Sequence, residues 1–473
     1  MNAMLWSEQE LMQALGVAPS ALLRVPVSGV SIDTRTLQPG DLFFAIKGDS
    51  SDGHDYVERA FAAGAAACVV GIERGKALSA HGPLFAVDEP LRAMERLGIA
   101  ARARTKAKIV AVTGSVGKTS AKEMLRLVLS KVGATHASAA SYNNHWGVPL
   151  TLARMPADTA FGVFEIGMNH SNEIAPLVAM VRPHVALITT IAPVHIEHLG
   201  SIEAIAEAKA EIFTGLEPKG VAVLNRDAPQ FELLEARARA QGAKVLSFGS
   251  DDEADVKLLR CDPSGEASRI RACIGVGELS FGLGAPGVHM AQNALGVLLA
   301  AKALGADLLV CAAALAEFAP PQGRGERFTL MTAGGPLTLI DESYNANPAS
   351  MRAALSLLGA TAPGKGGRRI AVLGDMLELG AEGAAMHADL ANALGAAKVD
   401  RLFCAGLLMR ALFDAATATM RGAWAPTAAE LEPAILRALH GGDVVMIKGS
   451  NGSRMGQLAA TLRQHFARAG ASA

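Results

Sequence analysis

The sequence predicts an α/β protein with three domains, each built on a mostly parallel sheet. The chain has 473 residues, which is too long for one hydrophobic core and suits about three domains of ordinary size. Short apolar strands alternate with helical segments along most of the chain, and this alternation is typical of parallel sheets. Polar loops follow several strands, at the sheet edge where ligands of such folds bind.

Composition excludes several classes of protein. Half of the residues are hydrophobic and the formal net charge is −1, which argues against a nucleic-acid partner or a membrane surface. The longest apolar region, residues 291–318, is interrupted by Lys302 and Asp307, so it predicts buried helices and no membrane insertion. Glu8 and Glu10 argue against a signal peptide, and we expect a cytoplasmic protein. The five cysteines lack C-x-x-C spacing, which indicates free thiols.

Two strands predict a small N-terminal α/β domain over residues 1–87. They are expected at 41–46 and 67–70, with a turn-rich stretch between them. Residues 88–320 form a second unit, in which strands that end in polar loops alternate with helices. Its strands are expected at 110–113, 161–166, 185–190 and 221–225.

A segment rich in proline and glycine, residues 320–326, is expected to link the second unit to a third. Beyond this segment the alternation of strands and helices begins again and continues to the end of the chain. The third domain is therefore expected over residues 321–473. Its clearest strands are expected at 337–340, 369–373 and 444–448.

The segment 109–120 joins an apolar strand to a helix through a glycine turn and a Lys-Thr pair. Gly114 and Gly117 allow the backbone N–H groups and the helix N-terminus to face a polyphosphate. Lys118 would reach the β- and γ-phosphates, and Thr119 would hold Mg²⁺. The alternative is an ordinary strand-to-helix turn with a surface lysine. The predicted phosphate loop comprises Gly114, Ser115, Val116, Gly117, Lys118, Thr119 and Ser120.

A lysine interrupts the apolar stripe of the helix that Ser201 opens. Lys209 lies within this stripe, whose other members are Ile202, Ile205, Ala206, Ile212, Phe213 and Leu216. Burial would lower the pKa of the lysine, and its neutral amine could react with CO₂ to give a carbamate, an anion able to bind a metal. Periodicity alone favours a lysine that extends its amine to solvent.

Two further positions could complete a metal site. Glu165 ends an apolar strand, and the alternative there is a solvated carboxylate. His195 and His198 follow another strand and precede the helix of Lys209. No third soft ligand accompanies these histidines, so one histidine beside hard carboxylates suits Mg²⁺ better than zinc. A purely structural His195 is the alternative.

Together these motifs resemble the Mur ligase superfamily, in order over nearly the whole chain. The run from Asp341 to Pro348 best distinguishes among the members of this superfamily, because sister ligases and folylpolyglutamate synthetases carry other residues there. The matching residues are Ser31-Ile-Asp-Thr-Arg35, Asp52-Gly-His54, the loop after Thr113, Asn143-Asn144, Glu165-Ile-Gly167, His195-Ile-Glu197, Lys209, His289 with Asn293, Gly323-Arg324, Asp341-Glu-Ser-Tyr-Asn-Ala-Asn-Pro348, Leu373-Gly-Asp-Met-Leu-Glu-Leu379 and Lys448-Gly-Ser450.

The resemblance implies a role for each domain: an N-terminal domain for a UDP moiety, a central P-loop ATPase domain, and a C-terminal Rossmann-like domain that closes over the nucleotide. The implied cofactors are ATP and two Mg²⁺ ions, with a carbamate on Lys209. Asn293 would meet adenine, Arg324 the phosphates and Asp341 the ribose. The catalytic residues would be Lys118, Lys209, His195 and Glu165, and the metal ligands Thr119, Glu165, His195 and Lys209.

The implied reaction is ATP-dependent carbon–nitrogen ligation in peptidoglycan precursor synthesis. D-alanyl-D-alanine would be joined to UDP-N-acetylmuramoyl-tripeptide through an acyl phosphate, and the protein is expected to be a monomer. The substrate would be held by Ser31, Asp33, Arg35, Asn143, Asn144, Tyr344, Asn345 and Asn347.

Two alternatives stay open. Another amide ligase of the superfamily, or a folylpolyglutamate synthetase-like enzyme, is disfavoured by residues 344–348. A P-loop switch or binding module would leave Lys209 and His195 unexplained. The chain also departs from the family pattern at Thr190, Met290 and Ser171-Asn172, which affects contacts to adenine and substrate.

Overall fold

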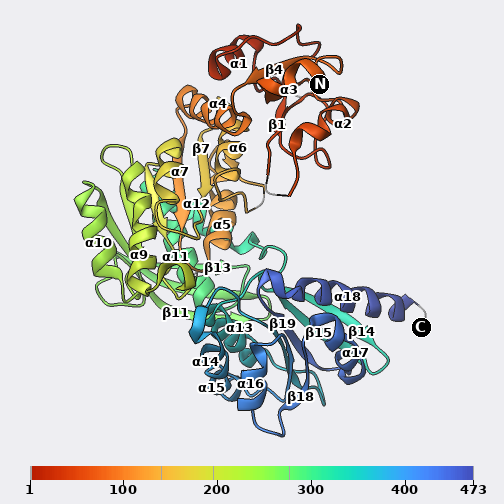
Figure 1. The fold of residues 1–473 in the computed structure, drawn as a ribbon. Coiled ribbons are helices and arrows are strands. Elements are labelled where there is room, and N and C mark those ends of the chain that lie inside the picture. Colours follow the sequence, from red (N-terminus) through yellow and green to blue (C-terminus); the bar gives the residue numbers. More distant parts are fainter. Residues whose placement is uncertain (1–2, 49, 140, 195, 276, 472–473) are drawn as a thin grey trace.

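Three sheets follow one another along the chain. The computed structural model describes residues 3–471 except 49, 140, 195 and 276. In Figure 1 the N-terminal part lies at one end, the C-terminal part at the other, and the central part between them. The sheets have four, nine and six strands, and most neighbouring strands are parallel. The predicted three-domain α/β fold is therefore confirmed, whereas the limits at residues 87 and 320 stay a prediction.

The N-terminal sheet has the order β1-β2-β3-β4 and is parallel throughout. Strands β2 and β3 are buried along their whole length because helices cover them, as expected for apolar runs in a parallel sheet. The elements are α1 (Glu8–Leu15), β1 (Gly29–Ser31), β2 (Asp41–Phe44), η1 (Gly53–Tyr56), α2 (Val57–Ala62), β3 (Ala67–Gly71), α3 (Ile72–Leu78) and β4 (Leu84–Val87).

Helix α4 (Pro90–Arg104) joins this domain to the next. Its buried Met94 and Leu97 share one hydrophobic cluster with the N-terminal sheet and with Leu150 of α6 (Gly147–Ala153). The indole N–H of Trp6 also donates to the carbonyl of Ala153 at 2.8 Å. The N-terminal domain is thus anchored to the central one by apolar packing and a buried hydrogen bond.

The central sheet has the order β13-β12-β11-β10-β9-β8-β5-β7-β6. Strands β5 to β10 are parallel, and β11 to β13 extend the sheet as an antiparallel meander. The strands are β5 (Lys108–Thr113), β6 (Thr135–Ala137), β7 (Phe161–Glu165), β8 (Val185–Ile188), β9 (Val221–Asn225), β10 (Lys244–Gly249), β11 (Val256–Ser264), β12 (Ala267–Ile274) and β13 (Gly277–Leu283). Because β5 lies between β7 and β8, the loops after these three strands meet at one edge.

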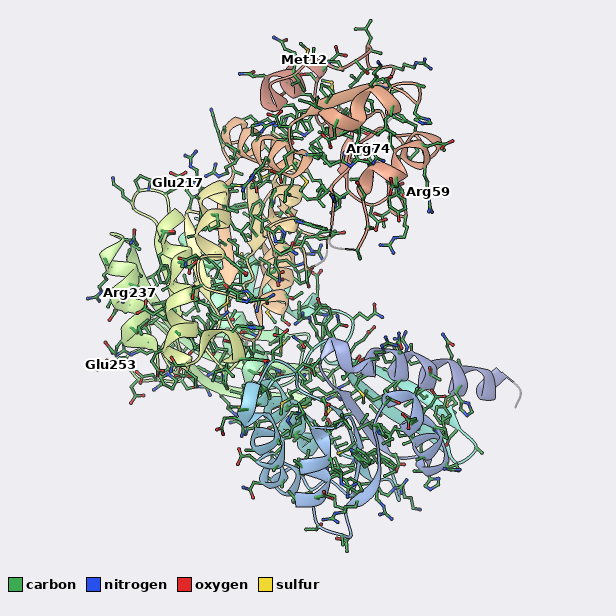
Figure 2. All side chains as sticks on the ribbon, viewed as in Figure 1. Met12, Arg59, Arg74, Glu217, Arg237 and Glu253 are labelled. Carbon is green, nitrogen blue, oxygen red and sulfur yellow. The ribbon has the colours of Figure 1, made fainter. Side chains whose placement is uncertain are left out.

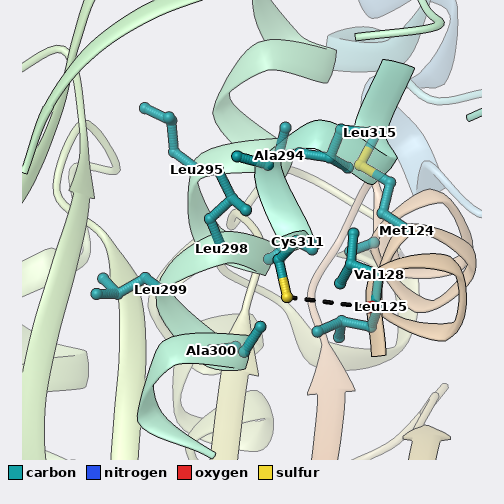
Figure 3. Packing of buried hydrophobic residues seen from close by; sticks show 14 of the residues in the cluster. Met124, Leu125, Val128, Ala294, Leu295, Leu298, Leu299, Ala300, Cys311 and Leu315 are labelled. Carbon is teal, nitrogen blue, oxygen red and sulfur yellow. Dashed lines mark hydrogen bonds between the residues drawn. The ribbon is translucent and has the colours of Figure 1, made fainter. Parts of the chain in front are cut away.

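Helices cover both faces of this sheet (Figure 1). Those of the central domain are α5 (Lys118–Ser130), α6 (Gly147–Ala153), α7 (Ile174–Val181), α8 (Ile196–Leu199), α9 (Ile202–Ala210), η2 (Glu211–Gly215), α10 (Phe231–Ala240), α11 (Val288–Ala303), α12 (Leu308–Ala314) and η3 (Leu315–Glu317). Figure 3 shows α5, α11 and α12 packing through Leu125, Leu298 and Cys311. The apolar region 291–318 therefore forms buried helices, as predicted. Among the described helices, none is long and apolar enough to cross a membrane.

The C-terminal sheet has the order β14-β15-β19-β16-β17-β18, and only β14 runs antiparallel. Helices pack on both faces, so this domain is a doubly wound, Rossmann-like sheet. Its elements are β14 (Glu326–Thr332), β15 (Gly335–Glu342), α13 (Pro348–Ala360), β16 (Arg369–Gly374), η4 (Gly380–Glu382), α14 (Gly383–Ala388), α15 (Ala391–Ala396), β17 (Arg401–Ala405), α16 (Met409–Ala415), β18 (Arg421–Ala425), α17 (Ala428–Ala438), β19 (Val444–Lys448), η5 (Asn451–Ser453) and α18 (Met455–Ala471).

The surface carries charges of both signs side by side. Arg237, labelled in Figure 2, pairs with Glu207 at 2.7 Å, and Arg226 pairs with Glu253. Such exposed pairs contribute little to stability. The five cysteines are free thiols, as predicted.

Candidate functional site

A cavity of about 510 Å³ lies between the central and C-terminal domains. Its central-domain wall consists of the loops after β5, β6, β7, β8 and β9 and the start of α11. Its C-terminal wall consists of the segment before β14, the turn after β15, the start of α13 and the end of β19. The predicted site residues that line it are Ser115, Val116, Gly117, Lys118, Thr119, Ser120, Asn143, Glu165, Asn293, Arg324, Tyr344, Asn345 and Asn347.

The phosphate loop needs glycine at two positions. Gly114 has φ +146°, and a Cβ there would lie 2.0 Å from Thr189 Oγ1. Gly117 has φ +87°, and its Cβ would lie 2.7 Å from Asn293 Nδ2. Both backbone conformations are unfavourable for residues with a side chain, and neither position has space for one. The loop therefore turns tightly into α5, whose first backbone N–H groups face the cavity.

Lys118 begins α5, and its amine folds back over the loop. Its Nζ donates to the carbonyl of Gly114 at 2.6 Å and lies 3.4 Å from the carbonyl of Ser115. Burial lowers the pKa of Lys118; the charge of Glu165 opposes this effect and that of Arg324 adds to it. The amine thus stands at the centre of the cavity, near both a carboxylate and a second cation.

Residues that follow β8 hold the phosphate loop in place by hydrogen bonds. Thr189 Oγ1 donates to the carbonyl of Val116 at 2.5 Å, and the N–H of Ser115 donates to the carbonyl of Thr190 at 2.8 Å. Asn225, at the end of β9, donates to the carbonyl of Thr189 at 3.2 Å. Sequence reasoning assigned these three supporting residues no such role. Their only signal is that each is polar and ends or follows a buried parallel strand.

Glu165 is buried at the end of β7, with 2% of its surface exposed, so the solvated alternative is wrong. Asn143 Nδ2 donates to its Oε1 at 2.7 Å. Its Oε2 is buried and has no hydrogen-bond partner among the described residues. A buried carboxylate oxygen without a donor fits a cation ligand, because a buried polar atom without a hydrogen bond is otherwise costly. Thr119, at the start of α5, is also buried.

The rest of the predicted metal site is only partly described. His195 lies outside the described residues. Among those that are described, no three His, Cys, Asp or Glu side chains gather closely enough to hold a metal. A site of this kind suits Mg²⁺, which takes few protein ligands and completes its octahedron with water and phosphate oxygens.

Lys209 is fully buried, with 1% of its surface exposed. The expectation from periodicity, an amine extended to solvent, is therefore wrong. The helix is shorter than the stripe suggested: α9 is capped by Ser201, whose Oγ accepts the N–H of Ala204 at 3.1 Å, and ends at Ala210, before η2. Burial lowers the pKa of Lys209 well below its ordinary value, and the nearby charge of Lys118 lowers it further.

The C-terminal wall places Arg324 over the ring of Tyr344, with 4.0 Å between Cζ and the ring centroid. Asn347 lies on the same wall and caps α13 by accepting the N–H of Ser350 at 2.9 Å. Asp341 is buried beside this wall without lining the cavity, and its Oδ1 accepts the N–H of Ser343 at 3.0 Å.

Some predicted site residues lie away from the cavity. Ser31, Asp33 and Arg35 belong to the N-terminal domain, where Arg35 and Asp33 pair at 2.6 Å. Asn144 Oδ1 accepts the N–H of Gly147 at 2.9 Å and so serves the start of α6. Lys209 lies behind the cavity wall near Lys118, and its side chain does not line the cavity.

The cavity also contains residues to which sequence reasoning gave no role. Met290 and Thr190, which depart from the family pattern, both line it. Lys448 ends the apolar strand β19, and this position at a strand's carboxyl end is the signal that could have found it. The others include Ser141, Thr189, Asn225, His289, Gln292 and Glu342.

Three descriptions of known families match the chain. The Mur ligase middle domain matches residues 112–301, the glutamate ligase domain of Mur ligases matches 326–451, and the catalytic domain of the Mur ligase family matches 26–82. These ranges contain the phosphate loop, Glu165, Lys209 and most of the cavity wall.

Whole-chain comparisons agree. The UDP-N-acetylmuramoyl-tripeptide–D-alanyl-D-alanine ligase of Escherichia coli is 36% identical over 392 residues, which cover 83% of this chain and 84% of that one. The ligase of the same name from Rickettsia prowazekii is 30% identical over 456 residues, which cover 96% of this chain and 99% of that one. The crystal structure of MurF from Acinetobacter baumannii has a TM-score of 0.84 and 29% identity, covering 97% of this chain and 99% of that one. MurF ligase from Thermotoga maritima in complex with ADP shares the fold, with a TM-score of 0.75 and 22% identity. The match covers 93% of this chain and 98% of that one. The chain therefore belongs to the Mur ligase family.

Proposed function

We propose that this chain is the ATP-dependent ligase that adds D-alanyl-D-alanine to UDP-N-acetylmuramoyl-tripeptide, with release of ADP and phosphate. It would act as a monomer in the cytoplasm, in the synthesis of peptidoglycan precursors. The observation that carries the proposal is a phosphate loop that faces one cavity together with the Tyr344–Asn347 run. The relatives of that name, matched over most of their length, support the same reaction.

The nucleotide would lie along the phosphate loop. Backbone N–H groups of residues 114–120 and the N-terminus of α5 would face its phosphates, with Lys118 as the mobile cation. Asn293 packs against Gly117 and would contact adenine, and Arg324 would reach the phosphates from the opposite wall. Asp341 would bind the ribose, which requires a rearrangement because it does not line the cavity.

Two Mg²⁺ ions would be held by Thr119, Glu165, His195 and a carbamate on Lys209. When bound, they would supply positive charge to the phosphate oxygens. The unpartnered Oε2 of Glu165 supports its part in this set. The burial of Lys209 supports the carbamate, since a neutral amine can attack CO₂ whereas an ammonium cannot.

The reaction requires activation because a carboxylate is a poor electrophile. A carboxylate oxygen of the tripeptide attacks the γ-phosphorus and ADP leaves, which gives an acyl phosphate. The neutral amine of D-alanyl-D-alanine then attacks the acyl carbon and gives up a proton to solvent, and the tetrahedral intermediate expels phosphate to leave the amide. The first step brings two anions together, so the main task of Lys118 and Arg324 is to neutralise and align them.

The substrate would span the domains. Ser31, Asp33 and Arg35 would hold the UDP-bearing end in the N-terminal domain. The reacting end would lie in the cavity near Asn143, Asn144, Tyr344, Asn345 and Asn347. Asn144 also caps α6, so its contribution to substrate binding would come from the same loop that it stabilises.

ADP release tests the proposal. We expect rapid release with UDP-N-acetylmuramoyl-tripeptide only when D-alanyl-D-alanine is also present. Release driven by UDP-N-acetylmuramoyl-dipeptide with a single amino acid would indicate a sister Mur ligase, and release with a folate and glutamate would indicate a folylpolyglutamate synthetase. Slow hydrolysis that is indifferent to every acceptor would indicate a P-loop switch.

A further inference from the structure

A second buried lysine stands at the cavity, on the side opposite the phosphate loop. Lys448 is the last residue of β19, and 2% of its surface is exposed. Its Nζ donates to the carbonyl of Asn345 at 2.9 Å and lies 3.4 Å from the carbonyl of Glu342 and 3.5 Å from Glu342 Oε2. An ammonium has three N–H donors, so these three acceptors use all of them.

All three acceptors belong to the turn of residues 342–345, which leaves β15 at the cavity. Lys448 and Glu342 are also direct neighbours in the pairing of β15 with β19. The ammonium therefore connects the two ends of the turn to each other and to the centre of the C-terminal sheet. Two residues farther, just beyond β19, Ser450 Oγ donates to the carbonyl of Ala346 at 3.3 Å, so this part of the chain supports the segment at two points.

Tyr344 is part of this turn, and its ring packs against the side chain of Arg324. The N–H of Tyr344 donates to the carbonyl of Gly323 at 3.0 Å, and the guanidinium of Arg324 lies over its ring. Tyr344 is 42% exposed, so packing alone does not hold its ring in place. The position of the ring depends instead on the backbone of the turn, which Lys448 supports.

We infer that Lys448 is a positioning residue of the nucleotide site, which fixes the 342–345 turn and, through the ring of Tyr344, aligns the guanidinium of Arg324 in the cavity. The inference rests on the proposed contact between Arg324 and the nucleotide phosphates. It assigns Lys448 no contact with a substrate, because its three donors are already used within the protein.

Glu342 partly offsets the cost of burying the Lys448 ammonium. Burial lowers the pKa of Lys448, and the charge of Glu342 and its hydrogen bond oppose this effect. His289, at the start of α11 in the central domain, lies near the same pair, and burial lowers its pKa. Removal of the ammonium would leave the Glu342 carboxylate partly buried without its cation, so the turn would shift towards solvent.

Binding of a non-hydrolysable ATP analogue with Mg²⁺, measured by calorimetry, tests the inference. Lys448→Met removes the charge at nearly constant volume, and we expect it to weaken binding about tenfold, the scale of one misaligned charge-assisted contact. In an Arg324→Ala background the same change should have an effect of less than about twofold, because the contact it aligns is already absent. Equal effects in both backgrounds, or unchanged affinity in the single variant, would overturn the inference.

Two further variants separate positioning from a general loss of stability. Arg368 pairs with buried Asp443 just before β19, at the opposite end of the strand from the cavity. Arg368→Met should lower the melting temperature while leaving the affinity for the analogue unchanged. Tyr344→Ala removes an exposed ring and should weaken binding in the same Arg324-dependent way, which keeps the test decisive if Lys448→Met does not fold. Failure of the wild-type protein to bind the analogue would instead contradict the proposed function.

Discussion

At the scale of single residues, the site is defined by buried charges that have too few partners. Lys118 and Lys209 lie near each other; the charge of Glu165 favours the ammonium of Lys118, whereas Lys209 has the like charge of Lys118 nearby, which disfavours its ammonium. Glu165 holds one carboxylate oxygen without a donor. In a purely structural core such groups would be destabilising, because desolvated charges need compensation. Their presence together is best explained by a charged ligand with metal ions.

The first prediction concerns Lys118. Lys118→Ala should reduce ADP formation by about a hundredfold or more, because a positioned cation at the phosphates is lost, while the fold is retained. Lys131→Ala is the matched control, since Lys131 ends the same helix and pairs with Glu317 on the surface. Steady-state kinetics with circular dichroism give the answer. Near-wild-type turnover of the Lys118 variant would contradict the phosphate-loop assignment.

The second prediction concerns the carbamate. Lys209→Ala should lose most activity, and Lys209→Arg should not restore it, because arginine keeps a cation and cannot form a carbamate. A small carboxylate in excess should partly rescue the alanine variant by supplying an anion at the vacated position. Initial rates with and without added carboxylate measure this. Activity in the arginine variant without rescue of the alanine variant would sink the hypothesis, as would density for an unmodified ammonium in the active, metal-loaded enzyme.

At the scale of elements, the decisive unit is β5, its glycine turn and α5. The apolar strand is buried between β7 and β8, and α5 packs on the sheet through Met124 and Leu125. Thr189 Oγ1 connects the turn between them to the end of β8 by a hydrogen bond to Val116. We expect this contact to keep the phosphate loop rigid before any ligand arrives, which would lower the entropic cost of binding.

The third prediction tests that rigidity. Gly114→Ala should abolish nucleotide binding, because its Cβ would lie 2.0 Å from Thr189 Oγ1 and the loop would have to move. Gly16→Ala is the control: Gly16 has φ +76° but nothing within 4 Å of a Cβ. The control should lose about 1 kcal/mol of unfolding free energy and keep its affinity. Calorimetric binding with denaturant unfolding separates the two effects, and wild-type affinity in Gly114→Ala would refute the argument.

At the scale of the whole molecule, the residues proposed to bind the nucleotide are divided between two domains. Asn293 precedes the 320–326 linker, whereas Arg324 lies within it and Asp341 follows it. The domains also touch away from the cavity, where η4 of the C-terminal domain approaches α8 of the central one. Asp341 lies buried beside the cavity without lining it. The proposed binding of one nucleotide by all three residues therefore requires a rearrangement at the boundary between the two domains.

The fourth prediction is domain closure. Small-angle scattering should show a smaller radius of gyration when an ATP analogue and UDP-N-acetylmuramoyl-tripeptide are both present, because ligands on two domains draw them together. The Lys118→Ala variant provides the control, since it should not compact. Identical curves for the wild-type protein with and without ligands would count against closure.

The sequence alone determined the position of several buried strands and of the phosphate loop. Predicted strands at 221–225 and 444–448 match β9 and β19, because apolar runs bounded by turn residues encode their own secondary structure. Glycines at 114 and 117 likewise identify a phosphate loop from local spacing. Only the tertiary structure decided that Lys209 is buried and that Lys448 supports the turn carrying Tyr344. The physical reason is that burial and long-range contacts depend on which distant segments pack together. A helical stripe or a strand end has the same local sequence pattern whether its charged residue is exposed to water or buried in protein.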